Sequence, residues 1–153
     1  EAMDFMFDMS RDNARTPFQW DGSENAGFST KKPWLKVNEN YHEINVEKEK
    51  EDESSILNWY KELIELRLHS KYSEVLTEGS ICPVFEEQKN LLAYERVMGE
   101  QKLLVLCNYQ GEERKAELNH MWKDVIKDNY ENIVSEEVGE ILLRPYEAVI
   151  LEM

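Results

Sequence analysis

The spacing of large apolar side chains predicts one long helix in the middle of the chain. In the segment "ILNWYKELIELRLH", residues 56–69, these side chains recur at intervals of three and four. The stripe consists of Ile56, Trp59, Tyr60, Leu63, Leu66 and the stem of Arg67. Positions three and four apart share one side of an α-helix. We therefore expect this stripe to face a core.

After about residue 71 the pattern becomes alternating, which is typical of short β-strands. The candidate strands are "VLTEG", "CPVFEE", "LLAYERVM", "KLLVLCNY", "RKAELN", "GEILLR" and "YEAVILEM", with turn material such as "EQKN" and "MGEQ" between them. "AYERV" alternates like a half-buried strand, whereas "LLVLC" is continuously apolar and predicts burial on both faces. Residues 120–138 predict an irregular excursion with one short strand. The fold class is therefore mainly β, an antiparallel sandwich of roughly six to eight strands.

The first part of the chain is irregular by comparison. Residues 1–41 are rich in Asn, Gly and Pro around one apolar island, "PFQW", and Pro17 and Pro33 disfavour a long helix. The run "EKEKEDESS" fits a solvated helix entrance. A single strand and helix cannot bury their own apolar faces. We therefore expect residues 1–71 to be the tail end of a larger domain and residues 72–153 to be a β domain.

Charge removes several classes of partner. The formal net charge is −14 and the pI about 4.7, whereas nucleic acid and anionic lipid attract positive surfaces. No apolar run approaches the ~20 residues of a membrane-spanning helix, and "EAMDFMFDM" lacks the basic flank of a signal peptide. We expect no nucleic-acid partner, no membrane partner and a cytoplasmic location.

Cysteine and histidine indicate no metal site or cofactor. Cys82 and Cys107 are too few for a disulfide framework, and Cys107 within "LLVLCNY" predicts a small buried thiol. The three histidines, at positions 42, 69 and 120, lack metal-ligand spacing. Phosphate-binding glycine loops and the "GxSxG" motif are also absent from the sequence.

The segment "SRDNARTPFQWDGSENAGF", residues 10–28, crowds arginine, aspartate and asparagine beside aromatic rings. With "PWLKVNENYHEINV", the helix "YKELIELR" and the final "LRPYEAVILEM", it resembles the α-amylase superfamily over nearly the whole chain. The similarity is to the oligo-1,6-glucosidase and α-glucosidase branch, which includes dextran glucosidases and trehalose-6-phosphate hydrolases. Phe18 is a departure, since many members carry Met there.

The resemblance implies a (β/α)₈ barrel followed by an antiparallel domain. "PFQW" would belong to the eighth strand region, and the helix at 56–69 would be the last barrel helix. The implied reaction is retaining hydrolysis of a terminal α-glucosidic bond in a short oligosaccharide. Such enzymes need two carboxyl groups about 5–5.5 Å apart, which this family carries on earlier strands. None of the 32 acidic residues lies in a matching motif, so we expect no catalytic residue here and no activity from the chain alone.

By the same resemblance, Arg15 reaches the −1 subsite and grips hydroxyls of the non-reducing glucose. A guanidinium suits this work because its rigid fork makes paired hydrogen bonds. Arg11 and Asp12 would brace the loop, and Asn13 would shape its turn. Arg15 also has a structural interpretation, as an ion-pair partner of Asp12 or Asp21.

Trp20 and Asp21 complete the residues expected to support this loop. Trp20 is more often barrel packing than a sugar platform, because tryptophan is mostly buried. Asp21, like Pro17, fits loop geometry.

Other functions remain open from the sequence. The chain could be a free-standing β-sandwich that binds carbohydrate or serves as a structural module, or, on charge alone, an acidic protein-interaction domain. Exposed aromatics on one sheet face would favour the carbohydrate-binding module; the candidates are Tyr94, Tyr109, Trp122, Tyr130 and Tyr146. It could also be the same part of a trehalose-6-phosphate hydrolase or dextran glucosidase. Linkage preference and substrate phosphorylation depend on loops that the sequence does not contain.

Overall fold

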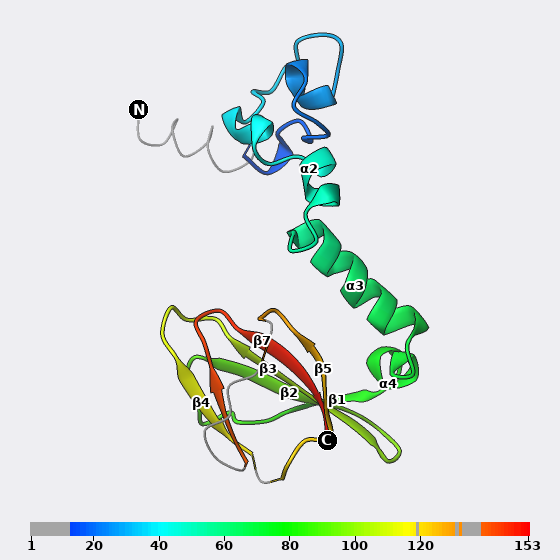
Figure 1. The fold of residues 1–153 in the computed structure, drawn as a ribbon, viewed down its shortest axis with the longest axis vertical. Helices are drawn as coiled ribbons and strands as arrows, with labels where there is room; N and C mark the ends of the chain where they lie inside the picture. The colour runs from blue at the N-terminus through cyan, green and yellow to red at the C-terminus, as the bar shows by residue number, and fades with distance from the viewer. Residues whose placement is uncertain (1–12, 119, 131, 133–138) are drawn as a thin grey trace. The chain divides into compact units, whose positions relative to one another are not determined.

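A computed structural model describes residues 13–118, 120–130, 132 and 139–153 (Figure 1). The chain divides into two compact units, residues 1–65 and residues 66–153. The predicted domain division between residues 71 and 72 stays a prediction. No helix in the described part of the chain is long and apolar enough to cross a lipid bilayer.

The described residues of the first unit form short helical turns joined by loops. These are the 3₁₀ helices η1 (Asn13–Arg15), η2 (Glu24–Gly27) and η3 (Glu39–His42) and the α-helix α2 (Val46–Glu51), followed by the start of α3 (Ile56–His69). Between residues 13 and 65 there is no β-strand. In particular, the island at 17–20 is not a strand, because no strand among the described residues lies beside it to pair with. The carbonyls of Gln19 and Trp20 instead accept hydrogen bonds from the backbone N–H groups of Val46 and Glu47.

Helix α3 confirms the predicted long helix. Ser55 caps its first turn, because its Oγ accepts a hydrogen bond from the backbone N–H of Asn58 at 3.2 Å. None of the fourteen residues of α3, all of which the structure describes, is buried. Of the predicted stripe, Leu66 packs against the buried cluster of Tyr72, Val75 and Leu103. A row of four apolar side chains at spacings of four is exposed: Ile56, Tyr60, Ile64 and Leu68.

The second unit confirms the predicted antiparallel β-sandwich. Its larger sheet has the order β1-β2-β3-β7-β5, and a two-stranded sheet pairs β4 with β6; Figure 1 shows them as two layers. The strands are β1 (Ser80–Pro83), β2 (Leu91–Met98), β3 (Gln101–Asn108), β4 (Arg114–Glu117), β5 (Asp124–Asp128), β6 (Glu140–Leu143) and β7 (Ala148–Glu152). β5 is the short strand expected within the irregular excursion.

One predicted strand is wrong. "VLTEG" lies mostly in the helix α4 (Ser73–Thr77), because tertiary contacts override the β propensity of Val75 and Thr77. The Arg96 side chain on β2 donates to the carbonyls of Val75 at 3.1 Å and Leu76 at 3.0 Å, at the C-terminal end of α4. Arg67 donates to the same Leu76 carbonyl at 2.7 Å. Both guanidinium groups therefore bind carbonyl oxygens at the helix C-terminus, where a positive charge complements the helix dipole.

Strand β3 is buried on both faces, as its continuous apolar run predicts. Leu104 and Leu106 join the core between the two sheets. Leu103, on the opposite face, packs with Tyr72 and Val75 in a second cluster. Because successive side chains of a strand alternate between faces, the continuously buried stretch Leu103–Leu106 is apolar at every position.

Candidate functional site

The segment expected to grip a sugar is only partly described. Arg15 ends η1 and is exposed, and the backbone of Asn13 lies in the same turn. Arg11 and Asp12 fall outside the described residues. The following Pro17 is buried, so the loop is anchored immediately beyond Arg15.

Two aromatic rings follow Arg15. Phe18 and Trp20 have ring centroids 4.7 Å apart at an interplanar angle of 60°, a tilted geometry that aromatic pairs favour. Both remain about half exposed, at 55% and 52%. Among the described residues, therefore, nothing covers Trp20 in the manner of barrel packing. Its ring is available either to a ligand or to another protein segment.

Asp21 shapes the loop that follows. Its carboxylate accepts hydrogen bonds from the Oγ and from the backbone N–H of Ser23, the latter at 2.8 Å. These bonds lower the pKa of the Asp21 carboxyl. The carboxylate also lies against Gly27, where an added Cβ would stand 2.4 Å from Oδ2. Asp21 therefore has the contacts of a loop-supporting residue.

The same loop holds three consecutive residues in the left-handed region. Asn25, Ala26 and Gly27 have φ values of 55°, 58° and 66°, and a non-glycine residue there costs roughly 1–2 kcal/mol. Two backbone hydrogen bonds offset this cost, because the N–H groups of Trp20 and Asp21 donate to the carbonyl of Ala26 at 2.9 and 3.3 Å. The strained turn is therefore hydrogen-bonded to the backbone of Trp20 and fixes the position of that residue.

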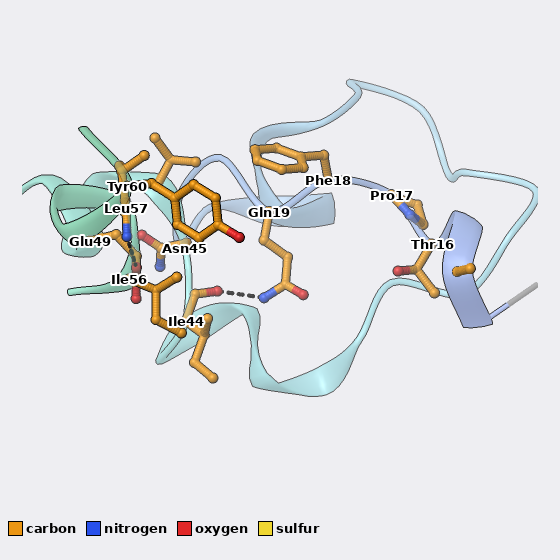
Figure 2. A pocket seen from close by; sticks show the side chains of 12 residues that line it. Thr16, Pro17, Phe18, Gln19, Ile44, Asn45, Glu49, Ile56, Leu57 and Tyr60 are labelled. Atoms are coloured by element: carbon orange, nitrogen blue, oxygen red, sulfur yellow. Dashed lines mark hydrogen bonds between the residues drawn. The ribbon is translucent and has the colours of Figure 1, made fainter. Parts of the chain in front are cut away.

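A cavity of about 660 Å³ lies within the first unit (Figure 2). Its lining combines the 14–19 segment, residues 44–46 and 49, and the start of α3: Ala14, Thr16, Pro17, Phe18, Gln19, Ile44, Asn45, Val46, Glu49, Ile56, Leu57 and Tyr60. Most of these side chains are apolar. Arg15 is not part of this lining, so the structure does not bring the predicted sugar-gripping residue into the cavity.

The polar side chains that line the cavity make hydrogen bonds to backbone groups of the same unit. Gln19 Nε2 donates to the carbonyl of Ile44 at 2.5 Å. The buried Asn45 caps α2 by accepting from the N–H of Lys48 at 3.0 Å, and Glu49 accepts from the N–H of Leu57 at 3.2 Å. Sequence reasoning missed this cavity, although Asn45 before "VEKEKE" carries a recognisable N-cap signal.

The cavity lacks the pair of carboxylates that a retaining glycosidase uses. Glu49 is the single carboxylate of the cavity lining, whereas retaining glycosidases need two. Among the described residues, no three His, Cys, Asp or Glu side chains gather closely enough to hold a metal ion.

The two thiols show no reactive environment. Cys107 is half-buried in β3 rather than fully buried, and burial raises the pKa of its thiol. Cys82 is exposed on the edge strand β1.

The aromatic candidates in the sandwich do not form a row on a sheet face. Tyr109, Tyr130 and Tyr146 are exposed, but all three lie in loops between strands. Two of these loops are joined where Tyr130 Oη donates to the carbonyl of Pro145 at 2.7 Å. The other two candidates, Tyr94 and Trp122, are only partly exposed. The described residues therefore do not present the flat aromatic face expected of a free-standing carbohydrate-binding module.

Two family models match the chain in succession. One, described as the catalytic domain of alpha amylase, matches residues 1–79, and the other, the C-terminal domain of the alpha-amylase SusG, matches residues 91–150. The two matches define the class: part of an alpha-amylase catalytic domain followed by a C-terminal β domain. The chain belongs to the alpha-amylase family.

Two relatives and one solved structure match almost the whole chain. An oligo-1,6-glucosidase of Parageobacillus thermoglucosidasius is 38% identical over all of this chain, and a trehalose-6-phosphate hydrolase of Bacillus subtilis is 38% identical over 94% of it. The crystal structure of an isomaltulose synthase from Protaminobacter rubrum superposes with a TM-score of 0.87 at 35% identity over 99% of this chain. The chain spans only 27%, 26% and 28% of these three proteins.

Proposed function

We propose that this chain is the C-terminal portion of an α-glucosidase of the oligo-1,6-glucosidase type. The parent protein would hydrolyse terminal α-glucosidic bonds of short oligosaccharides with retention. The observation that carries the proposal is the match of the complete chain, at 38% identity, to 27% of an oligo-1,6-glucosidase. The catalytic carboxyl groups would come from the barrel portion, so the 153 residues alone would be inactive.

The apolar surfaces of the first unit support a missing barrel partner. The 660 Å³ cavity is lined mainly by apolar side chains, and the adjoining α3 exposes Ile56 and Tyr60. Large contiguous apolar patches on a soluble protein mark interaction surfaces. The barrel strands and helices are the partner of matching character, because their own flanks are apolar.

Arg15 is the residue that we propose for substrate binding in the parent enzyme. Its guanidinium can make two charge-assisted hydrogen bonds to neighbouring sugar hydroxyls. Asn38 Nδ2 donates to Thr16 Oγ1 at 3.3 Å, which ties the next loop to the segment that carries Arg15. Arg11, Asp12, Asn13, Trp20 and Asp21 would support the loop. The substrate would be an α-linked glucose oligosaccharide or disaccharide.

We also propose a cytoplasmic location, for which the free cysteines Cys82 and Cys107 offer support, since unpaired thiols are the rule in reducing compartments. Trehalose-6-phosphate hydrolase remains the alternative activity, because a relative of that name is also 38% identical to this chain. The likeness to an isomaltulose synthase adds isomaltulose formation as an outcome to be tested.

The test compares two proteins: the 153-residue chain, and the polypeptide extended through the upstream coding sequence. We expect the extended protein to hydrolyse nitrophenyl α-glucoside and isomaltose, with NMR showing α-glucose as the first product. The short chain should give no turnover. Hydrolysis by the short chain, or none by the extended one, would contradict the proposal. Formation of isomaltulose, or exclusive cleavage of trehalose 6-phosphate, would reassign the activity.

A further inference from the structure

An ion pair occupies inward-facing positions of the β-sandwich. Glu95 on β2 lies directly opposite Leu104 on β3, and Leu104 belongs to the core between the sheets. Directly opposed residues of an antiparallel pair share a face, as do residues two apart in one strand, so Lys102 lies on this face too. Lys102 Nζ is 3.1 Å from Glu95 Oε2 and 3.3 Å from Oε1.

Charges at such positions call for an explanation. β2 and β3 lie side by side inside the larger sheet (Figure 1), where apolar residues are expected. Burying a charge is costly unless it is paired. The side chains of Glu95 and Lys102 remain 21% and 43% exposed, so the pair is neither fully buried nor on an open surface. The ion pair therefore lies where the interior of the sandwich opens to solvent.

A cavity of about 340 Å³ lies beside Glu95. Its other walls are apolar: Val84, Phe85, Leu104, Leu118 and Met153. Leu104 is 2% exposed, so this side of the cavity is continuous with the hydrophobic core. The volume lies at the lower end of the roughly 300–1,000 Å³ typical of small-molecule sites.

The aromatic wall of the cavity is held in an unusual backbone conformation. Phe85 has φ = 56°, a value that bulky residues rarely adopt. The turn is closed by the N–H of Gln88, which donates to the carbonyl of Phe85 at 2.9 Å. The Phe85 side chain nevertheless packs against the core cluster. Strained conformations of this kind concentrate at ligand sites.

We propose that this cavity binds a single neutral pyranose ring, without chemistry. One ring hydroxyl would donate to the carboxylate of Glu95, the one polar side chain of the lining, and the apolar C–H face of the ring would pack against Phe85. A neutral ligand with hydroxyl donors fits because a carboxylate accepts hydrogen bonds and Lys102 already balances its charge, whereas an anion would be repelled by Glu95.

The proposal can be tested on the 153-residue chain, independently of its catalytic parent. Two-dimensional ¹H–¹⁵N NMR would follow a titration with methyl α-glucoside. We expect saturable shifts at Phe85, Glu95, Lys102 and Leu104, with a Kd of about 1 mM or weaker for so small a ligand. No saturable shift at these residues up to about 50 mM sugar would overturn the proposal.

Matched variants separate a specific site from an adventitious one. Glu95→Ala and Phe85→Leu should each weaken binding about tenfold or more, a loss of about 1.4 kcal/mol, whereas Glu100→Gln, an exposed position between the same strands, should leave Kd unchanged. Melting temperatures would identify variants that fail to fold; in that case Glu95→Gln and Lys102→Met decide. Equal binding in all folded variants, or equal shifts with cyclohexanol, would show a non-specific cavity and refute the proposal.

Discussion

The surroundings of Asp128 favour the neutral form of its carboxyl group, and Asp128→Asn should therefore stabilise the protein. The Asp128 side chain is 7% exposed, and Arg144 Nη2 lies 3.7 Å from its Oδ2. Among the described residues, that oxygen has no hydrogen-bond partner. Arg144 is committed to the fully buried Glu147, to which it donates from Nε at 3.0 Å and from Nη2 at 2.8 Å. Its guanidinium also stacks 3.9 Å from the ring of Tyr130.

The electrostatic consequence has a definite sign. Burial raises the pKa of the Asp128 carboxyl, and the negative charge of Glu147 adds to the rise, against the hydrogen bond from the N–H of Tyr130 and the charge of Arg144. A carboxyl whose pKa is higher in the folded than in the unfolded state favours folding when protonated. This stability is present below the unfolded pKa, near 3.8, and is lost as the pH rises through the folded pKa.

Asparagine imitates the protonated carboxyl and keeps the acceptor used by Tyr130. A buried, unsatisfied acceptor costs about 1–3 kcal/mol, so Asp128→Asn should raise the free energy of unfolding by about 1 kcal/mol at pH 7. The melting temperature should rise by about 2–4 °C. The gain should shrink as the pH falls toward 4, because the wild-type carboxyl then protonates.

Urea unfolding of both proteins between pH 4 and pH 8 measures this difference directly. Asp124→Asn is the matched control, because Asp124 lies on the same strand and is exposed; its effect should stay within about 0.5 kcal/mol at every pH. A destabilised Asp128→Asn protein, or two stability profiles that run parallel across the pH range, would refute the reasoning.

Two further predictions concern the loop near Arg15. In the extended enzyme, Arg15→Ala removes two charge-assisted hydrogen bonds of about 1.5–3 kcal/mol each, so kcat/KM should fall by roughly 10²–10⁴ at an unchanged melting temperature, and Arg15→Lys should recover little of it. Early melting with kinetics within a few-fold of wild type would make Arg15 a structural residue. Gly27→Ala should cost about 1–3 kcal/mol of unfolding free energy, because its Cβ would meet Asp21 Oδ2 at 2.4 Å. Gly99→Ala, at φ = 59° with no atom within 4 Å, should cost less in the same urea assay, and equal losses would show that the contact with Asp21 is unimportant.

Strands whose neighbours lie close in sequence were predictable from periodicity. β2 and β3 pair along their full length across a tight turn, so their patterns reflect a local hairpin and its two covered faces. The segment around Val75 contains β-branched residues, which predicted a strand. It forms α4 instead, because Arg96, twenty-one residues later, donates a hydrogen bond to a carbonyl at the end of that helix. The alternating pattern of β2 predicted a half-buried strand. It did not show that Arg96 binds the end of α4, because that contact is with residues distant in the sequence.

The sequence by itself determined the antiparallel sandwich, the helix at 56–69 and the family, because alternation, helical spacing and a long motif around Arg15 are local features. Tertiary structure alone decided the rest. It placed Glu95 and Lys102 at one inward-facing opening, left Asp128 buried beside Glu147, and assembled a cavity from three separated segments without Arg15. Periodicity shows which face of a strand or helix a residue occupies. It does not show which distant residue lies opposite, and burial and charge pairing depend on that neighbour.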